Sequence, residues 1–218
     1  MLNLTSARKH MIQSQLRANN ITNSDVLKLF DLLPRDFFVP SLFTKQAYAD
    51  MPIPLEFNQH MLTPLEEAKI IQALNVQKTD CVLEIGTGSG YFTGLLAKLS
   101  AQVESVDIFP EFSLHAKNKL SLLGIDNVRC LSGDAAKEWQ DIERFNKIVI
   151  TGSLVLEPKQ YLSRLCDNGT LFAIVGSGDT MQARLYEKIS QNVVSVRNLF
   201  EMNTPTLLNA PKPNLFDF

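Results

Sequence analysis

The sequence has few of the residues that mark metal-binding or disulfide-bonded proteins. Only three cysteines and three histidines occur among its 218 residues, and no two cysteines form a CxxC pair. Cys81, Cys130 and Cys166 are odd in number and far apart, so the spacing predicts neither a zinc site nor a disulfide framework. We expect all three to be buried, reduced side chains, because free cysteine behaves as a small hydrophobe.

Excess charge of either sign is also missing. The 21 Lys and Arg residues nearly balance the 23 Asp and Glu residues, which leaves a formal net charge of -2. A protein that binds nucleic acid through its phosphates normally has a basic balance or a basic face, so no nucleic-acid partner is expected.

Long apolar runs are missing as well. The first residues, MLNLTSARKHMIQSQL, contain no apolar core after the basic residues and no small-residue cleavage site, and no window approaches 18 apolar residues. We therefore expect no membrane partner and a cytoplasmic location.

The chain does contain enough apolar residues, 45% of the total, to bury a substantial core. Apolar residues at helical spacing predict two short helices, over 5–20 and 24–33. The stretch PRDFFVPSLFTKQAYADMPIPL, at 34–55, is aromatic and interrupted by prolines. It is too irregular for one element and too apolar for a free linker, so it is predicted to pack as a lid or flank.

From residue 64 onward, predicted strands alternate with helices. Helices are predicted at 64–75, 90–99, 110–123 and 158–165, and strands at 81–85, 103–108, 128–133, 147–151 and 170–176. This alternation predicts an α/β fold, a Rossmann-like doubly wound and mostly parallel sheet. The runs RLYEKI and VVSVRNLFEM predict antiparallel C-terminal edge strands. The expected organisation is an N-terminal helical extension with an active-site loop (1–63), a cofactor-binding core (64–210) and a tail (211–218).

The strongest chemical motif is VLEIGTGSGYF at 82–92, where a buried strand leads through a glycine loop into a helix. Glycines at such a turn let the backbone approach a ligand and aim helix N-terminal amides at it. The candidate cofactor-binding residues of this loop are Gly86, Thr87, Gly88, Ser89 and Gly90.

Two residues near this loop distinguish between cofactors. A dinucleotide fingerprint, G-x-G-x-x-G, requires glycine where this chain has Tyr91. Glu84, two residues before the first glycine, would repel a pyrophosphate but favour a cationic ligand. S-adenosylmethionine (SAM), which carries an ammonium and a sulfonium, therefore fits better than NAD, and an NAD-dependent oxidoreductase is disfavoured.

Further candidate cofactor residues follow the next two strands. Asp107 ends the second strand, where an acid can accept hydrogen bonds from both ribose hydroxyls of an adenosine, and Ile108 follows it. Asp134, in the SGDA stretch with Ala135, can accept from an adenine amino group or serve only as a turn residue. No metal site is predicted.

Several stretches together resemble one enzyme family. VLEIGTGSGY, SVD, SGDAAKEW, PRDFFVP and QHMLTP are similar to the protein-L-isoaspartate O-methyltransferases, and the likeness runs from the first helix to about residue 210. The resemblance implies a SAM-dependent enzyme that methylates the carboxylate of isoaspartyl residues in damaged proteins or peptides. The ester then collapses to a succinimide.

The loop NQHMLTP, at 58–64, departs from the family pattern Thr-Ile-Ser-x-Pro. With the family proline on Pro64, Leu62 takes the place of the family serine, whose hydroxyl lies near the cofactor methyl and the acceptor carboxylate. His60 and Thr63 are the candidate replacement donors, so the catalytic candidates are His60, Leu62 and Thr63. The alternatives are a methyltransferase with another acceptor and a SAM-binding homologue without catalysis.

A second departure lies near the C-terminus. Where the family carries a Val-Pro-Leu step that helps to bind the peptide, this chain reads NTPTLLN at 203–209 and keeps only Pro205. Tyr48 and Asp50 either line the acceptor pocket or serve ordinary packing and capping. The oligomeric state is not readable from the sequence.

Overall fold

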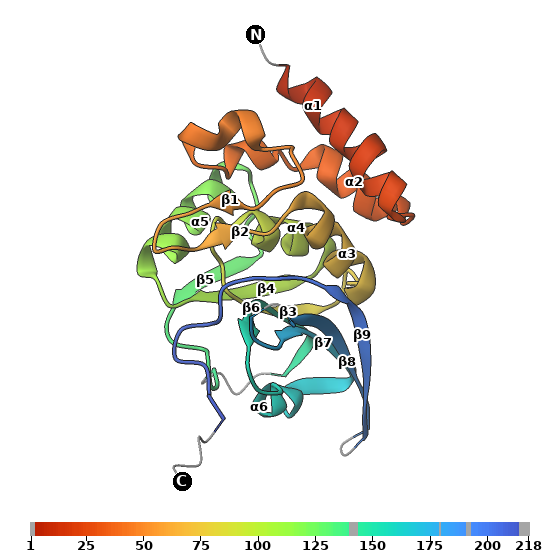
Figure 1. The fold of residues 1–218 in the computed structure, drawn as a ribbon, viewed down its shortest axis with the longest axis vertical. Helices are drawn as coiled ribbons and strands as arrows, with labels where there is room; N and C mark the ends of the chain where they lie inside the picture. The colour runs from red at the N-terminus through yellow and green to blue at the C-terminus, as the bar shows by residue number, and fades with distance from the viewer. Residues whose placement is uncertain (1–2, 140–143, 179, 191–192, 214–218) are drawn as a thin grey trace.

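A seven-stranded sheet forms the centre of the molecule (Figure 1). The computed structural model describes residues 3–139, 144–178, 180–190 and 193–213. Along the sheet the strand order is β5-β4-β3-β6-β7-β8-β9. The strands are β3 (Cys81–Ile85), β4 (Gln102–Asp107), β5 (Val128–Ser132), β6 (Phe145–Leu154), β7 (Leu165–Val175), β8 (Gln182–Ser190) and β9 (Val193–Glu201).

The direction of the strands confirms the predicted fold class. Strands β5, β4, β3, β6 and β7 run parallel, whereas β8 and β9 join the edge as an antiparallel hairpin. The chain builds outward from β3 through β4 to β5 and then returns to place β6 on the other side of β3. In open α/β sheets, ligands bind at the carboxyl ends of the strands at such a switch point.

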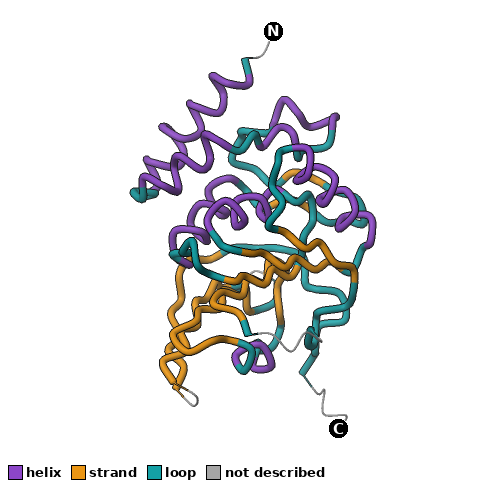
Figure 2. Tube along the Cα trace, turned by 180° about the vertical axis from the view of Figure 1, so that it is seen from behind, coloured by secondary structure: helices purple, strands orange, loops and turns teal. Residues whose placement is uncertain are grey.

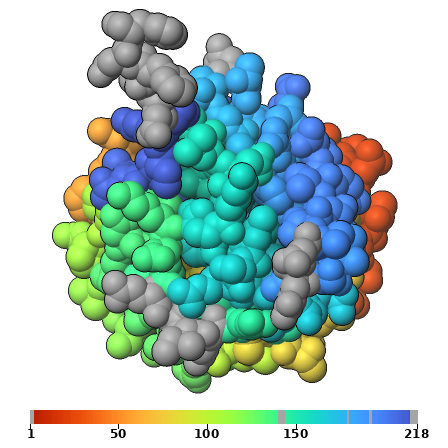
Figure 3. All heavy atoms as spheres, turned by 90° about the horizontal axis from the view of Figure 1, so that it is seen from below, coloured from red at the N-terminus to blue at the C-terminus, as the bar shows by residue number. Residues whose placement is uncertain are grey.

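Helices cover one face of this sheet more heavily than the other. They are α1 (Leu4–His10), α2 (Ser24–Leu32), α3 (Pro64–Leu74), α4 (Tyr91–Leu99), α5 (Pro110–Leu122) and α6 (Lys159–Leu162). In Figures 1 and 2 the first five lie on one side of the strands, and of the helices in the described residues only α6 lies on the other. Figure 3 views that second side, where green to blue residues dominate and red and orange residues appear only at the rim.

Alternation along β3 shows how the sheet divides the core. Val82 belongs to the apolar cluster beneath the N-terminal helices, while Leu83 and Ile85 belong to the cluster on the opposite face. Successive side chains of a strand point to opposite faces, so Glu84 shares the face of Val82 and lies toward α4.

Three local expectations differ from the structure. The helix predicted at 5–20 is an α-helix to His10, a wider π-helical turn over Met11–Leu16 and a 3₁₀ turn over Arg17–Asn19. The helix predicted at 158–165 is only the single turn α6, because Leu165 already starts β7, pairs with Phe145 and is fully buried. The three cysteines are free but half-buried, so the expectation that all are buried is wrong.

The irregular stretch before the glycine loop forms short turns and a small hairpin. Two 3₁₀ turns, Arg35–Phe37 and Ser41–Gln46, precede β1 (Ile53–Pro54), which pairs antiparallel with β2 (His60–Met61). A capping box at Thr63 then starts α3. The second strand of this hairpin, β2, therefore lies within the loop 58–64 that departs from the family pattern.

Candidate active site

Steric crowding explains two glycines of the loop between β3 and α4. Gly86 has φ +102°, and a Cβ atom there would lie 2.2 Å from Thr151 Oγ1. Gly90 has φ +82°, and its Cβ would lie 2.6 Å from the Ala116 side chain on α5. Glycine alone fits this backbone path at both positions. Because these two positions have no side chain, the loop occupies little space at the carboxyl end of β3.

The Asp107 carboxylate is fixed beside this loop. One oxygen accepts a hydrogen bond from the Gly88 amide at 2.9 Å, and the other accepts from the Phe109 amide at 3.0 Å. Burial raises the pKa of Asp107, while these backbone donors oppose the shift. Each oxygen keeps a lone pair for a further donor. The geometry therefore suits a pair of ribose hydroxyls.

Glu84 lies behind the glycine loop rather than on the cavity wall. Its carboxyl accepts hydrogen bonds from Thr93 Oγ1 at 2.5 Å and Ser105 Oγ at 2.6 Å, and the side chain is fully buried. Burial raises the pKa of Glu84 to about 8, although the two hydroxyl donors oppose the shift. A neutral acid does not provide the fixed negative charge that the sequence argument assigned to it.

The structure gives Asp134 two partners. One carboxylate oxygen accepts from the Ala136 amide at 3.0 Å and the other from Asn209 Nδ2 at 2.9 Å. The contact with Asn209 ties the stretch after β5 to the C-terminal segment 203–210. Asp134 and Ala135 both border the cavity, in keeping with an adenine-facing position.

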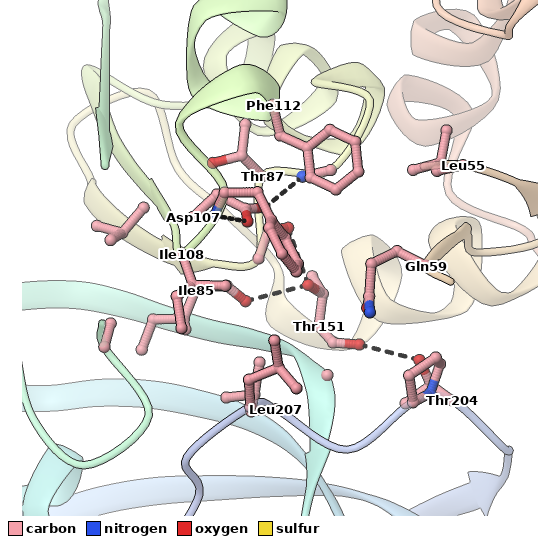
Figure 4. Close-up of a pocket in the computed structure, with 18 of the residues that line it drawn as sticks. Leu55, Gln59, Ile85, Thr87, Asp107, Ile108, Phe112, Thr151, Thr204 and Leu207 are labelled. Carbon is pink, nitrogen blue, oxygen red and sulfur yellow. Dashed lines mark hydrogen bonds between the residues drawn. The ribbon is translucent and has the colours of Figure 1, made fainter. Parts of the chain in front are cut away.

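One cavity brings most of the predicted site residues together (Figure 4). In Figure 4 the Gln59 side chain extends toward Thr151 across this cavity. Glu84, Gly90 and Thr63 do not border it. The predicted residues that do are His60, Leu62, Gly86, Thr87, Gly88, Ser89, Asp107, Ile108, Asp134 and Ala135.

The cavity supplies what an adenosine-containing cofactor needs: a glycine loop that admits close approach, an acid for the ribose and apolar walls.

The described residues include no group of three or more His, Cys, Asp or Glu side chains placed to hold a metal ion. None of the helices in the described ranges is long and apolar enough to cross a membrane.

Comparison with known proteins agrees with this geometry. Residues 6–206 match the profile of the protein-L-isoaspartate(D-aspartate) O-methyltransferase (PCMT) family. The chain belongs to the PCMT family. A protein-L-isoaspartate O-methyltransferase of Caulobacter vibrioides is 35% identical over 175 residues, 80% of this chain and 79% of that protein. One from Gloeobacter violaceus is 36% identical over 167 residues, 77% of this chain and 82% of that protein.

Solved structures agree on the fold. A candidate PCMT of Plasmodium falciparum, crystallised with S-adenosyl-L-homocysteine, aligns with a TM-score of 0.79 at 18% identity and covers 95% of this chain and 99% of its own. A second protein-L-isoaspartate O-methyltransferase aligns with a TM-score of 0.79 at 20% identity, covering 91% of this chain and 65% of its own. The PCMT fold therefore extends over nearly the whole chain.

The loop that departs from the PCMT pattern lies at one end of the cavity. Leu62 borders the cavity and is 6% exposed, and it packs in the apolar cluster under the N-terminal helices. Thr63 is the N-cap of α3, and its hydroxyl accepts from the Glu66 amide at 3.2 Å. Of the three catalytic candidates, the structure thus brings only His60 and Leu62 to the cavity.

A buried arginine that the sequence analysis did not single out holds this loop. Arg35, fully buried, donates from Nη2 to the Leu62 carbonyl oxygen at 2.6 Å and from Nη1 to the Glu67 carboxylate. Its guanidinium also lies 4.9 Å from the centre of the Tyr91 ring, at the start of α4. Burial raises the pKa of Glu67 to about 7, opposed by Arg35. The place of Arg35 in the PCMT-like stretch PRDFFVP was the signal in the sequence that could have identified this arginine.

Aromatic rings close another side of the cavity and were also missed. Phe57, in the turn between β1 and β2, stacks on Phe109 with ring centres 4.2 Å apart, and both rings contact Phe112 edge-on. Phe109 and Phe112 border the cavity. These rings come from segments far apart in sequence, so only folding brings them together.

The C-terminal segment reaches the cavity, whereas the two flank residues do not. Residues 204–208 border it, and Thr206 forms a parallel bridge with Ser153 at the end of β6. Tyr48 instead donates to the Asp36 carboxylate, and Asp50 accepts from the Leu65 amide at the start of α3. These contacts are those of packing and capping residues.

Proposed function

We propose that this PCMT-family protein transfers a methyl group from SAM to the side-chain carboxylate of L-isoaspartyl residues in damaged proteins. The observation that carries the proposal is the single cavity in which the glycine loop and Asp107 meet the loop around Leu62. One end then suits the nucleoside of the cofactor, and the other end suits the acceptor.

The chemistry makes modest demands on the protein. When bound, SAM supplies an electrophilic methyl group, and an acceptor carboxylate oxygen takes this group as the sulfur–carbon bond breaks. A carboxylate with an ordinary pKa near 3.9 is already ionised at neutral pH, so no general base is needed. The remaining tasks are orientation and exclusion of water.

The residues of the chain divide these tasks. Asp107, held by the Gly88 amide, positions the ribose, and Asp134 faces the adenine. Arg35 fixes the backbone at residue 62, where the acceptor would lie. In this proposal the extension 1–63 supplies the acceptor loop, and the core 64–210 binds the cofactor.

The direct test is methyl transfer from labelled SAM to a peptide with one L-isoaspartate, beside its normal aspartate twin. We expect the wild type to label the first peptide and to leave the second unlabelled. We expect Leu62→Ser to label the isoaspartyl peptide faster, by at most about ten- to a hundredfold, because a hydrogen bond to a charged group contributes about 1.5 to 3 kcal/mol.

The comparison needs a stability control, since Leu62 is buried. Removing a buried leucine side chain costs about 2 to 5 kcal/mol, so both proteins are assayed below the unfolding temperature of the variant. Labelling that appears only in Leu62→Ser would point to the alternative of a different natural acceptor. No labelling by either protein, with SAM bound, would contradict the proposal.

We propose a cytoplasmic location and a protein or peptide substrate as the partner. The free, half-buried cysteines support a reducing compartment. The supporting observation for the substrate is the family membership itself.

A further inference from the structure

An isoaspartyl carboxylate has two oxygens, and only one of them takes the methyl group. The other oxygen remains charged and desolvated in the cavity unless a donor meets it. Within the PCMT pattern a serine hydroxyl stands at residue 62, but here that residue is Leu62. Another donor must therefore hold the second oxygen in this chain.

The negative charges around the cavity make a donor for this second oxygen more necessary. Three acidic residues, Glu67, Asp107 and Asp134, border the cavity, and none of its bordering residues in the described ranges is a lysine or an arginine. Arg35 lies just behind Glu67, but it is fully buried and already donates to Glu67 and to the Leu62 carbonyl. Among the described residues that border the cavity, only His60 can carry a positive charge.

The two replacement donors named from the sequence are not equivalent. Thr63 is engaged in the capping box of α3: its hydroxyl accepts from the Glu66 amide, and its own amide donates to the Glu66 carboxylate at 2.8 Å. It also does not border the cavity. Side chains alternate along extended backbone, so a residue next to Leu62 points away from it. Thr63 is therefore unsuitable.

His60 has the geometry of a donor. It sits in β2, where the pairing of Pro54 with His60 fixes its backbone, and its ring is half-buried at the cavity. Its Nδ1 lies 3.2 Å from the Met61 carbonyl oxygen. A carbonyl oxygen can only accept, so this contact places a proton on Nδ1 and leaves Nε2 as the nitrogen available to a ligand. Nε2 then donates only when the ring is cationic.

We propose that the His60 imidazolium holds the acceptor carboxylate through Nε2 and so replaces the hydroxyl lost at Leu62. This inference rests on the proposed function. It also accounts for release: methylation removes the negative charge of the acceptor, and a neutral ester binds an imidazolium less tightly than a carboxylate does. His60 thereby gives the site a preference for an anionic acceptor.

Two substitutions at His60 separate charge from shape. His60→Phe keeps a planar ring without a donor, and His60→Lys keeps a cationic donor. We expect His60→Phe to lower kcat/KM for the isoaspartyl peptide about ten- to a hundredfold, and His60→Lys to retain most of it. The dissociation constant of SAM and the unfolding temperature should change little in both variants.

A double-variant cycle tests whether residues 60 and 62 share one task. Leu62→Ser should raise kcat/KM more in the His60→Phe background than in the wild type, because the serine hydroxyl then replaces the donor that His60→Phe lacks. A purely structural role for His60 would give the same gain in both backgrounds.

The outcomes distinguish the two proposals. Wild-type protein that binds SAM but does not label the isoaspartyl peptide overturns the proposed function. If His60→Phe labels the peptide as fast as the wild type does, the assignment of His60 is overturned and the proposed function stands. Reduced labelling by His60→Phe that Leu62→Ser restores supports it.

Discussion

Asp107→Ala is expected to weaken SAM binding by about 10²- to 10⁴-fold. The carboxylate of Asp107 would accept both ribose hydroxyls, and each hydrogen bond to a charged acceptor contributes about 1.5 to 3 kcal/mol. The same substitution removes the acceptor of the Gly88 amide and so loosens the glycine loop itself. Isothermal titration of the purified variant with SAM measures the loss.

The exposed Asp126→Ala serves as a matched control, since Asp126 lies in the turn between α5 and β5, away from the cavity. It should bind SAM as the wild type does. Asp107→Asn should fall between the two, because the amide keeps one acceptor but loses the charge. If Asp107→Ala bound SAM within about threefold of the wild type, the ribose assignment would be wrong.

The parts of this site that could be predicted from the sequence are those that short, continuous stretches of residues encode. The glycine loop follows a buried strand, and Asp107 ends the next strand, so a parallel sheet brings both to one edge. The antiparallel hairpin of β8 and β9 was likewise visible as two strand-like runs after the last predicted parallel strand. Each of these inferences needed only periodicity and strand order.

The parts that could not be predicted depend on contacts between distant segments. Arg35 reaches the Leu62 carbonyl across 27 positions of the sequence, and Asn209 reaches Asp134 across 75. Phe57 likewise stacks on a residue that is distant in the sequence, Phe109. The periodicity of apolar residues in the sequence does not indicate which distant side chains contact each other.

Glu84 illustrates a different limit. Its position before the glycines was clear, but its charge depends on the strand face that carries it. Because Glu84 shares the face of Val82, it faces Thr93 on α4 and Ser105 on β4 in a dry interior. Burial, which raises its pKa to about 8, dominates over the two hydroxyl donors. The acid is therefore mainly protonated at neutral pH.

This protonation gives the folded state a specific dependence on pH. The folded pKa of about 8 lies above the ordinary glutamate value of 4.5, so the folded state binds one more proton than the unfolded state between these values. The stability associated with Glu84 is fully present below about pH 4.5 and is lost as the pH rises through about 8. Between about pH 5.5 and 7, one proton corresponds to a loss of about 1.4 kcal/mol per pH unit.

Glu84→Gln should remove this slope, because an amide accepts from Thr93 and Ser105 but does not ionise. Urea unfolding at several pH values between 5.5 and 8.5 would show the free energy of unfolding falling less steeply in the variant than in the wild type. Glu67, whose pKa is about 7, leaves a smaller slope of the same sign in both proteins. The exposed Glu138→Gln should behave as the wild type. Parallel slopes in wild type and Glu84→Gln would mean that Glu84 is ionised in the fold, and the cationic-ligand role first assigned to it would return.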